Sequence, residues 1–173
     1  MTAREEILSK IIDRDCSLPG GVWESPFEPE DLWAQFEERL VGLGGSMIDL
    51  ERLTMLASGS VFAEAGTGFE SNVESIWDAE VGISVGEFAI AETGSVVVSS
   101  APRRHRMSTL LPPVSVVMLD SGQIVATLAD AFDRIPTRNS VIISGTSRTA
   151  DIEGVLVRGV HGPGEFYVYR GPQ

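Results

Sequence analysis

The sequence predicts an α/β domain in which helices cover a mainly parallel β-sheet. Short runs of β-branched and other apolar residues alternate along the chain with segments whose apolar residues recur at helical spacing. The strand candidates are apolar throughout, as is typical of parallel strands that are buried on both faces. No repeat or linker divides the 173 residues. We therefore expect one domain over residues 1–173, with a helical amino-terminal part (1–43) and an α/β core (45–173).

The amino-terminal part is expected to hold two helices. The first starts at Thr2, where a capping-box pattern with Glu5 precedes apolar residues at helical spacing, and it ends near Asp15. The second runs from Glu30 to Val41, because its apolar side chains share one face. The glycine-rich stretch from Gly42 to Gly45 ends this helix.

The α/β core is expected to alternate between strands and helices. Its strands are expected at the apolar runs 47–48, 61–63, 81–84, 88–91, 95–99, 114–119, 141–143 and 166–169. Its helices or helical turns are expected at 50–57, 71–78, 107–111 and 123–132. In open α/β sheets, ligands bind beyond the carboxyl ends of the strands. The turns that follow the strands are therefore the places where we expect a site.

The acidic composition argues against binding to nucleic acid or to a membrane surface. The chain has 13 Lys and Arg residues against 25 Asp and Glu, which gives a formal net charge of −12. Such a surface repels phosphate backbones and anionic lipids. The longest clean apolar run, Val114 to Leu119, is far too short to span a bilayer. Charges are scattered from Met1 to Asp15, so no signal peptide is expected, and we predict a cytoplasmic protein.

A single cysteine, Cys16, limits the cofactors that the chain could hold. It cannot form an internal disulfide, and there is no C-x-x-C pair for zinc or for an iron–sulfur cluster. The two histidines do not fall into a metal-ligand spacing either. We therefore predict no metal site and no cofactor in this chain.

The densest group of functional side chains follows the strand expected at 141–143. The stretch Ser144-Gly145-Thr146-Ser147-Arg148 combines hydroxyls, a glycine and an arginine. A strand end of this composition exposes backbone N–H groups and hydroxyls, which suit an anion. The alternative is an ordinary strand-to-helix turn, with Ser147 or Thr149 as a helix cap.

Arg148 could grip a carboxylate or a phosphate through two parallel hydrogen bonds. Its alternative role is an ion pair with Asp151 or Glu153, which follow it closely and which we also include among the ligand-binding candidates.

Glu92 and His161 are the candidates for proton transfer. Glu92 directly follows apolar residues, and partial burial could make it a general base, with Thr93 and Gly94 of the same turn as ligand-binding candidates. His161 precedes Gly162 and Pro163 in a loop, where it could serve as an acid–base group. The structural alternatives are a hydrogen bond from Glu92 to its own turn and one from His161 to loop carbonyls.

These residues resemble the signature of the LUD-domain family, the group of lactate utilisation protein C. Its members carry a pattern close to S-G-P-S-[RK]-T-A-D-I-E, followed by G-V-H-G-P. Here the two segments are 144–153 and 159–163, with Thr146 in place of the usual proline, which should loosen the turn rather than abolish it. Two further elements match upstream, Ala91-Glu92-Thr93-Gly94-Ser95 and Ser108-Thr109-Leu110-Leu111-Pro112-Pro113. Elements in the same order are more specific than one short motif.

The resemblance implies a Rossmann-like fold akin to the ribose-5-phosphate isomerase and CoA-transferase group. It also implies a subunit that takes part in oxidising L-lactate to pyruvate, together with partner proteins that carry the iron–sulfur clusters. The expected ligand is then a small anion such as lactate. The alternatives are a free-standing enzyme or binding protein for a sugar phosphate or an acyl-CoA, by fold analogy, and a scaffold within such a complex. In each case with a working site, we expect Glu92, Ser144, Ser147, Arg148 and His161 to surround a single cleft.

Overall fold

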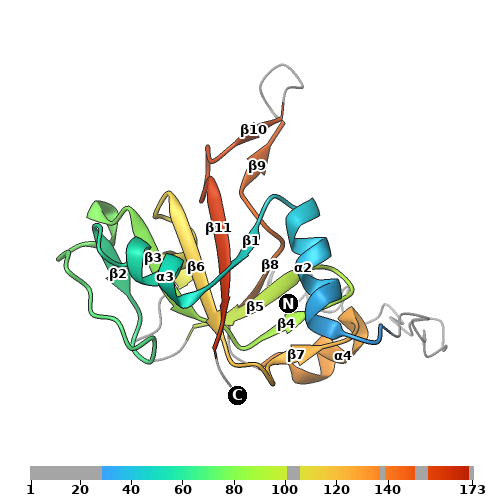
Figure 1. The fold of residues 1–173 in the computed structure, drawn as a ribbon. Coiled ribbons are helices and arrows are strands. Elements are labelled where there is room, and N and C mark those ends of the chain that lie inside the picture. Colours follow the sequence, from blue (N-terminus) through green and yellow to red (C-terminus); the bar gives the residue numbers. More distant parts are fainter. Residues whose placement is uncertain (1–28, 101–105, 137–138, 151–155, 172–173) are drawn as a thin grey trace, which may run out of the picture.

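The structure is a computed structural model that describes residues 29–100, 106–136, 139–150 and 156–171, and it is built on two β-sheets (Figure 1). The helix expected between Thr2 and Asp15 lies outside these residues, and so do Cys16, Asp151 and Glu153. Among the described residues, no helix is both long and apolar enough to cross a membrane.

The larger sheet has five strands, and all of them are parallel. In spatial order they are β1 (Ser46–Ile48), β11 (Glu165–Arg170), β6 (Val114–Leu119), β3 (Val81–Val85) and β2 (Val61–Ala63). β6 lies in the centre, where Val116 pairs with Ile83 on one side and with Tyr167 on the other. These strands confirm the predicted α/β class with a mainly parallel sheet.

The smaller sheet has four strands of mixed direction. Their order is β7 (Ile124–Val125), β4 (Phe88–Ile90), β5 (Ser95–Ser99) and β8 (Ser140–Ile143). β5 runs antiparallel to both β4 and β8. β4 and β8 therefore point the same way, and the turns that follow them lie at the same edge of this sheet. The apolar runs of these strands resemble those of the parallel sheet, so a second sheet was not expected from the sequence.

The helix expected at 123–132 is wrong in its first half. Ile124 and Val125 pair with β4 as a short strand, which two β-branched residues favour. The helix that follows, α4 (Leu128–Arg134), begins only after Thr127, whose side chain accepts a hydrogen bond from the Asp130 N–H in a capping box. The apolar residues of 123–132 have helical spacing, but Ile124 and Val125 form a strand because they pair with β4 in the folded protein.

The remaining helical segments are short. α2 (Leu32–Gly42) is capped by Asp31, whose carboxylate accepts from two backbone N–H groups. α3 (Leu50–Leu56) is capped by Asp49, whose carboxylate accepts from the N–H of Arg52. The helix expected at 71–78 is reduced to the 3₁₀ turn η1 (Ile76–Asp78), and the segment expected at 107–111 is the 3₁₀ turn η2 (Arg106–Thr109).

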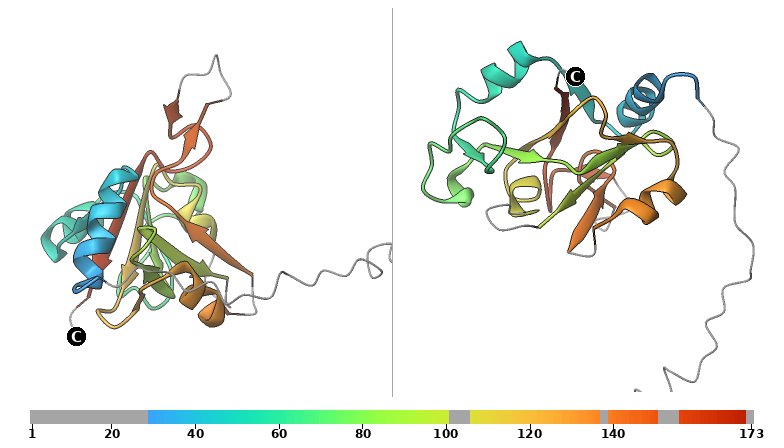
Figure 2. Two further views of the ribbon diagram at one scale, coloured as in Figure 1. Left: turned by 90° about the vertical axis from the view of Figure 1, so that its right-hand side faces the viewer. Right: turned by 90° about the horizontal axis from the view of Figure 1, so that it is seen from below.

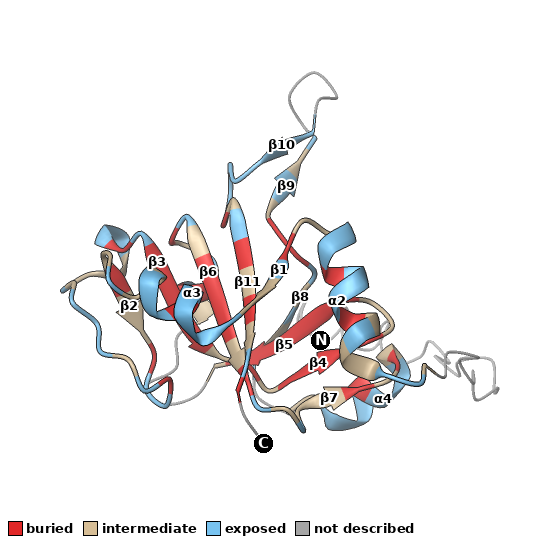
Figure 3. Ribbon diagram, in the orientation of Figure 1, coloured by how far each residue is buried: buried red, intermediate tan, exposed pale blue. Residues whose placement is uncertain are grey.

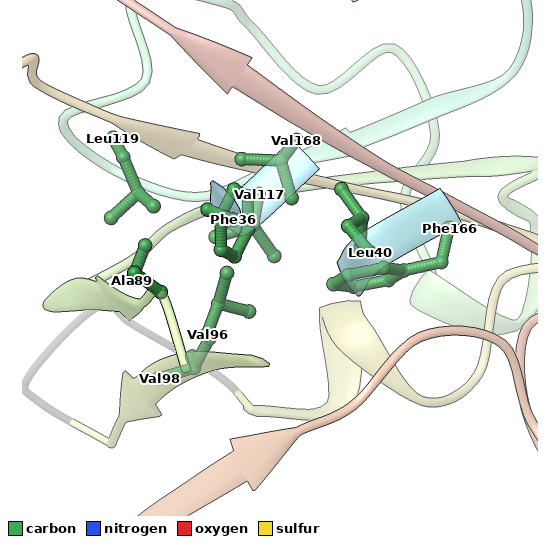
Figure 4. Packing of buried hydrophobic residues seen from close by; sticks show 10 residues of the cluster. Phe36, Leu40, Ala89, Val96, Val98, Val117, Leu119, Phe166 and Val168 are labelled. Atoms are coloured by element: carbon green, nitrogen blue, oxygen red, sulfur yellow. The ribbon is translucent and has the colours of Figure 1, made fainter. Parts of the chain in front are cut away.

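The main core lies where α2 and the two sheets meet. Phe36 and Leu40 of α2 are fully buried, and Figure 4 shows them among side chains of both sheets. The other buried members of this core are Ala89, Ala91, Val96, Val98, Val117, Leu119, Phe166 and Val168. Figure 3 shows the buried positions concentrated in the strands, with the outer sides of α2 and α3 exposed.

Two smaller cores complete the layers. Leu53 of α3 packs with Val61, Val81, Ile83 and Val116 on the opposite face of the parallel sheet. α4 covers the outer face of the smaller sheet, where Ala131 packs with Phe88, Ile90, Val97 and Val125. The molecule is therefore layered as α3, parallel sheet, smaller sheet and α4, with α2 filling the wedge between the two sheets.

A narrow two-stranded ribbon projects from this body. Its strands are β9 (Arg148–Thr149) and β10 (Val157–Arg158), which pair in antiparallel fashion. Figures 1 and 2 show the ribbon extending away from both sheets, above the end of α2. Leu156, Val157 and Arg158 are exposed on it.

Candidate functional site

A cleft of about 280 Å³ lies between the end of β8, the turn η2 and the loop that precedes β11. Its lining comes from three segments of the chain that are far apart in sequence: Thr109-Leu110, Val141 to Ser147, and His161 to Pro163 with Phe166. Because Phe166 is near the start of β11, the cleft lies beside the amino-terminal edge of the parallel sheet. The site expected beyond the carboxyl ends of the parallel strands is instead formed by a turn of the smaller sheet.

The two loops of the family signature are joined by backbone hydrogen bonds. Ser147 N–H donates to the Pro163 carbonyl at 2.9 Å, and Gly159 N–H donates to the Ser147 carbonyl at 3.0 Å. A Cβ on Gly162 would lie 3.0 Å from the Cβ of Ser147, so a glycine lets the loops meet closely. The prediction that Ser144, Ser147 and His161 share one cleft therefore agrees with the structure.

The glycine of the Ser144–Ser147 loop is needed for contact with α2. Gly145 has a φ of 79°, and a Cβ there would lie 2.5 Å from the Leu43 carbonyl oxygen. An L-residue would therefore be strained both by its backbone conformation and by overlap with the residue that ends α2. This packing role does not exclude binding, because the other side of the loop faces the cleft.

The upstream elements contact the same place. Ser95 Oγ and Ser144 Oγ are 2.7 Å apart and share a hydrogen bond, which joins the turn after β4 to the turn after β8. Ser108 Oγ lies 2.8 Å from Ser84 Oγ and donates to the buried carboxylate of Glu64. This network fixes η2 on the parallel sheet and so places Thr109 and Leu110 in the cleft wall.

The cleft is suited to a small anion by its lining. Four of its side chains are hydroxyls, from Thr109, Ser144, Thr146 and Ser147, and one is the exposed imidazole of His161. None of the lining residues that the structure describes is acidic, although the whole chain has a net charge of −12. In the described part of the chain, the N–H groups of Gly145 and Thr146 have no hydrogen-bond acceptor. Unpaired N–H groups and hydroxyls around a glycine at positive φ are typical of anion sites.

Glu92 does not line this cleft. Its Oε2 accepts a hydrogen bond from the N–H of Leu128 at 2.8 Å and thus holds the first residue of α4. Thr93 and Gly94 are also absent from the lining, and the Thr93 hydroxyl is buried without a hydrogen-bond partner in the structure. Proton transfer by Glu92, and ligand binding by Thr93 and Gly94, stay predictions that the geometry does not test.

Arg148 lies apart from the cleft lining as well. It starts β9, where it is the register partner of Arg158, and its guanidinium extends toward Gly44. The prediction that Arg148 and Glu92 share the cleft with Ser144, Ser147 and His161 is therefore wrong for these two residues. Asp151 and Glu153 lie outside the described residues, so their pairing with Arg148 stays a prediction.

Several cleft residues were missed by the sequence analysis. Thr109 and Leu110 belong to a matching family element, but their short helical segment carried no signal for a ligand. Phe166 and Ile142 were counted only as strand residues. Among the residues that the structure describes, no group of three His, Cys, Asp or Glu side chains could hold a metal ion. The predicted lack of a cofactor stays untested.

Comparison with known proteins places these features in a family. A family model described as the LUD domain matches residues 34–169. "Lactate utilization protein C" of Bacillus subtilis is 37% identical in an alignment of 103 positions that covers 54% of this chain and 43% of that protein. "Uncharacterized protein YkgG" of Escherichia coli K12 is 41% identical in an alignment of 102 positions that covers 53% of this chain and 44% of that protein. The aligned part of the chain thus spans less than half the length of these two relatives.

Two further comparisons cover more of the chain. "Uncharacterized protein NMB1437" of Neisseria meningitidis is 28% identical over 97% of this chain and 93% of its own length. A crystal structure of a DUF162 family protein from Deinococcus radiodurans has a TM-score of 0.57 at 19% identity, over 80% of this chain and 95% of that one, and therefore shows a similar fold. Because the family model matches most of the sequence, the chain belongs to the LUD domain family.

Proposed function

We propose that this chain is a lactate-utilisation subunit and that its cleft binds a small carboxylate such as L-lactate. The observation that carries the proposal is that the described residues of the lining include hydroxyls and free N–H groups but no acidic side chain, in a chain that is strongly acidic overall. The likeness to proteins named lactate utilization protein C supports lactate as the first ligand to test. A cytoplasmic location belongs to the same proposal.

The ligand carboxylate would lie against the Gly145 and Thr146 N–H groups and the hydroxyls of Ser144 and Ser147. Hydrogen bonds from neutral donors to a carboxylate are charge-assisted, and each adds roughly 1.5–3 kcal/mol where it is sheltered from water. His161, at the mouth of the cleft, would accept the proton of the lactate hydroxyl as a general base. A proton-transfer role for Glu92 would require its carboxylate to leave the Leu128 N–H.

Oxidation of L-lactate to pyruvate breaks the hydroxyl O–H bond and the C2–H bond and releases two protons and two electrons. One proton would go to His161 and the other to solvent, and the two electrons need an acceptor. The single cysteine of this chain cannot ligate an iron–sulfur cluster. The electrons would therefore pass to a partner protein that carries such clusters, while this chain would bind and orient the carboxylate.

Calorimetric titration of the full chain with L-lactate, pyruvate, ribose 5-phosphate and coenzyme A tests the proposal. We expect saturable binding of L-lactate or pyruvate, weakened by Ser147→Ala and unchanged in the control Ser58→Ala, because Ser58 is exposed after α3 and is not among the cleft residues. No binding of either carboxylate would contradict the proposal.

A second candidate function is supported by the same donor groups. Backbone N–H groups and hydroxyls bind phosphate as readily as carboxylate, so a free-standing enzyme or binding protein for a sugar phosphate or an acyl-CoA fits the cleft too. Binding of ribose 5-phosphate or coenzyme A without binding of lactate would favour this function. Co-purification with cysteine-rich iron–sulfur proteins would favour the first.

A further inference from the structure

Two arginines of the projecting ribbon meet over one point of the backbone. Arg148 and Arg158 are register partners in β9 and β10, so their side chains leave the same face of the ribbon. A Cβ on Gly44 would lie 2.9 Å from Nη2 of Arg148 and 3.4 Å from Nη1 of Arg158. The Oγ1 of Thr146 would lie 3.1 Å from the same position. Both guanidiniums and one hydroxyl therefore surround Gly44, just beyond the end of α2.

Neither guanidinium has a counter-ion in the part of the chain that the structure describes. No hydrogen bond or ion pair is made by Arg148 or Arg158 there. This is unexpected, because the chain has almost twice as many acidic as basic residues. Two like charges at short range repel each other, and an anion between them would remove that repulsion.

Capping of α2 does not account for the pair. Cations near the carboxyl end of a helix are stabilised by its dipole, which is the main structural alternative. However, the Leu40 carbonyl already accepts from the N–H groups of Leu43 and Gly45, and the Val41 carbonyl accepts from Gly44. The last turn of α2 is thus closed by its own backbone, and no group in the described residues uses the guanidinium donors.

Gly44 lets both arginine side chains lie close to the backbone at the end of α2. Its φ of 82° is one that L-residues rarely adopt, and a side chain there would occupy the space in front of Arg148. Arg148 and Arg158 are both exposed, so a dissolved ligand can reach them.

We propose that Arg148 and Arg158, together with Thr146, form an anion site separate from the cleft. It binds a small ligand with a phosphate or a dicarboxylate group, whose several oxygens can accept from both guanidinium forks at once. The proposal does not depend on what the cleft binds. Since Thr146 also lines the cleft, the two sites adjoin at this residue.

Titration of the full chain with inorganic phosphate and, separately, with malonate at constant ionic strength tests this site. We expect at least one of the two probes to bind saturably, and Arg158→Gln and Arg148→Gln each to weaken that binding at least about tenfold, which corresponds to about 1.4 kcal/mol. Arg134→Gln is the matched control, because it removes the same charge from an exposed position at the end of α4 and should leave the affinity unchanged. Comparison of phosphate with malonate identifies which group the site prefers.

Three results would overturn the proposal. The first is the absence of saturable binding of either probe by the unaltered chain. The second is equal affinity in Arg158→Gln and Arg134→Gln. The third is a lower melting temperature of both ribbon variants without any anion and an unchanged affinity in the folded protein, which would assign the pair to stabilising α2 or the ribbon. L-lactate binding should be retained in Arg158→Gln, so failure of the cleft proposal is distinguishable from failure of this one.

Discussion

The turns that follow β4 and β8 are built alike, yet only one of them opens onto the cleft. Each carries a glycine with positive φ that packs against α2 or the residue that ends it, Gly94 at 66° and Gly145 at 79°. Each also carries a serine, and Ser95 and Ser144 are joined by a hydrogen bond. The two turns therefore hold α2 at two places along its last turns.

The difference between them lies in what covers the rest of each turn. Glu92 is held by the first N–H of α4, and Gly94 and Ser95 are buried. Ser144 is exposed at the cleft, and Ser147 is half-buried there. The comparison shows that one backbone design serves packing in both turns, while access to a ligand depends on whether a neighbouring helix covers the turn.

Substitution of Gly94 or Gly145 should have the largest effect on stability, because both turns need a glycine to pack against α2. A Cβ on Gly94 would lie 2.6 Å from Leu40 N, and one on Gly145 would lie 2.5 Å from Leu43 O. Positive φ alone costs an L-residue roughly 1–2 kcal/mol, and the overlap adds to this. We expect Gly94→Ala and Gly145→Ala each to lower the free energy of unfolding by about 2–4 kcal/mol, measured by urea denaturation.

Two other glycines allow the cost of backbone strain to be distinguished from the cost of steric overlap with α2. Gly68 has a φ of 78° with nothing near its Cβ position, so Gly68→Ala reports backbone strain alone. Gly122 has no positive φ and open space, so Gly122→Ala should be nearly neutral. If Gly145→Ala costs no more than Gly68→Ala, close packing on α2 is not what the glycine provides.

Substitutions of His161 and Glu92 should show that the cleft binds the ligand and that the turn after β4 serves stability. We expect His161→Ala to leave the melting temperature unchanged, because the side chain is exposed, and to weaken binding of L-lactate about tenfold. Glu92→Ala should do the reverse, because it removes the acceptor of the Leu128 N–H and should cost about 1–2 kcal/mol of stability. Glu92→Gln keeps an acceptor oxygen and is the control. Loss of lactate binding in a fully folded Glu92→Gln would instead assign Glu92 to the ligand site.

Most strands could be predicted from the sequence because each is a continuous apolar run with turn residues on both sides. Val114 to Leu119 form a strand as expected, and the strand expected at 81–84 is present as Val81–Val85, since continuous burial leaves a local signal. The division into two sheets left no such signal. Val141 to Ile143 are as apolar as the central strands, but β8 is a half-exposed strand at the edge of the smaller sheet.

The candidate site could be predicted only where its residues follow one another in the sequence. The Ser144–Ser147 loop and His161 were found because they are polar residues in dense turns. Thr109 and Leu110 reach the cleft only because Ser108 fixes η2 against Gly82, where a Cβ would overlap the Ser108 carbonyl. The direction of Arg148 depends on a ribbon that local spacing does not reveal, so its separation from the cleft required the structure.

The hydrogen bond between Ser95 and Ser144 joins the two turns, and its loss should have a smaller effect on stability than the glycine substitutions. A hydrogen bond between two hydroxyls contributes about 0.5–1.5 kcal/mol. Because the bond between Ser95 and Ser144 is only partly buried, we expect a double-mutant cycle of Ser95→Ala and Ser144→Ala to show coupling at the lower end of that range. The pair Ser99 and Ser140, whose hydroxyl oxygens are 2.6 Å apart at the other end of the same two strands, is the control, because neither serine is among the cleft residues. Both cycles should show coupling, but only Ser144→Ala should weaken binding of L-lactate. Additive effects of Ser95 and Ser144 would mean that the two turns are held by α2 alone.

Removal of the capping box of α4 should have the smallest effect on stability. It tests whether α4 keeps the turn that contains Glu92 covered. The Thr127 side chain and backbone donate to the Asp130 carboxylate and hold its pKa below the ordinary value of 3.8. A lowered pKa in the folded state means that the ionised group stabilises the fold above the unfolded pKa, and that this stability is lost as the pH falls through the folded pKa. Asp130→Asn should therefore lower the melting temperature slightly at pH 7, and the difference from the unaltered chain should disappear in acid, below pH 3.8. Because α4 covers Glu92, amide exchange at Leu128 should speed up in this variant at pH 7, while exchange at Gly145 should not change. A difference in melting temperature that persists unchanged into acid would show that the Asp130 charge does not stabilise the start of α4.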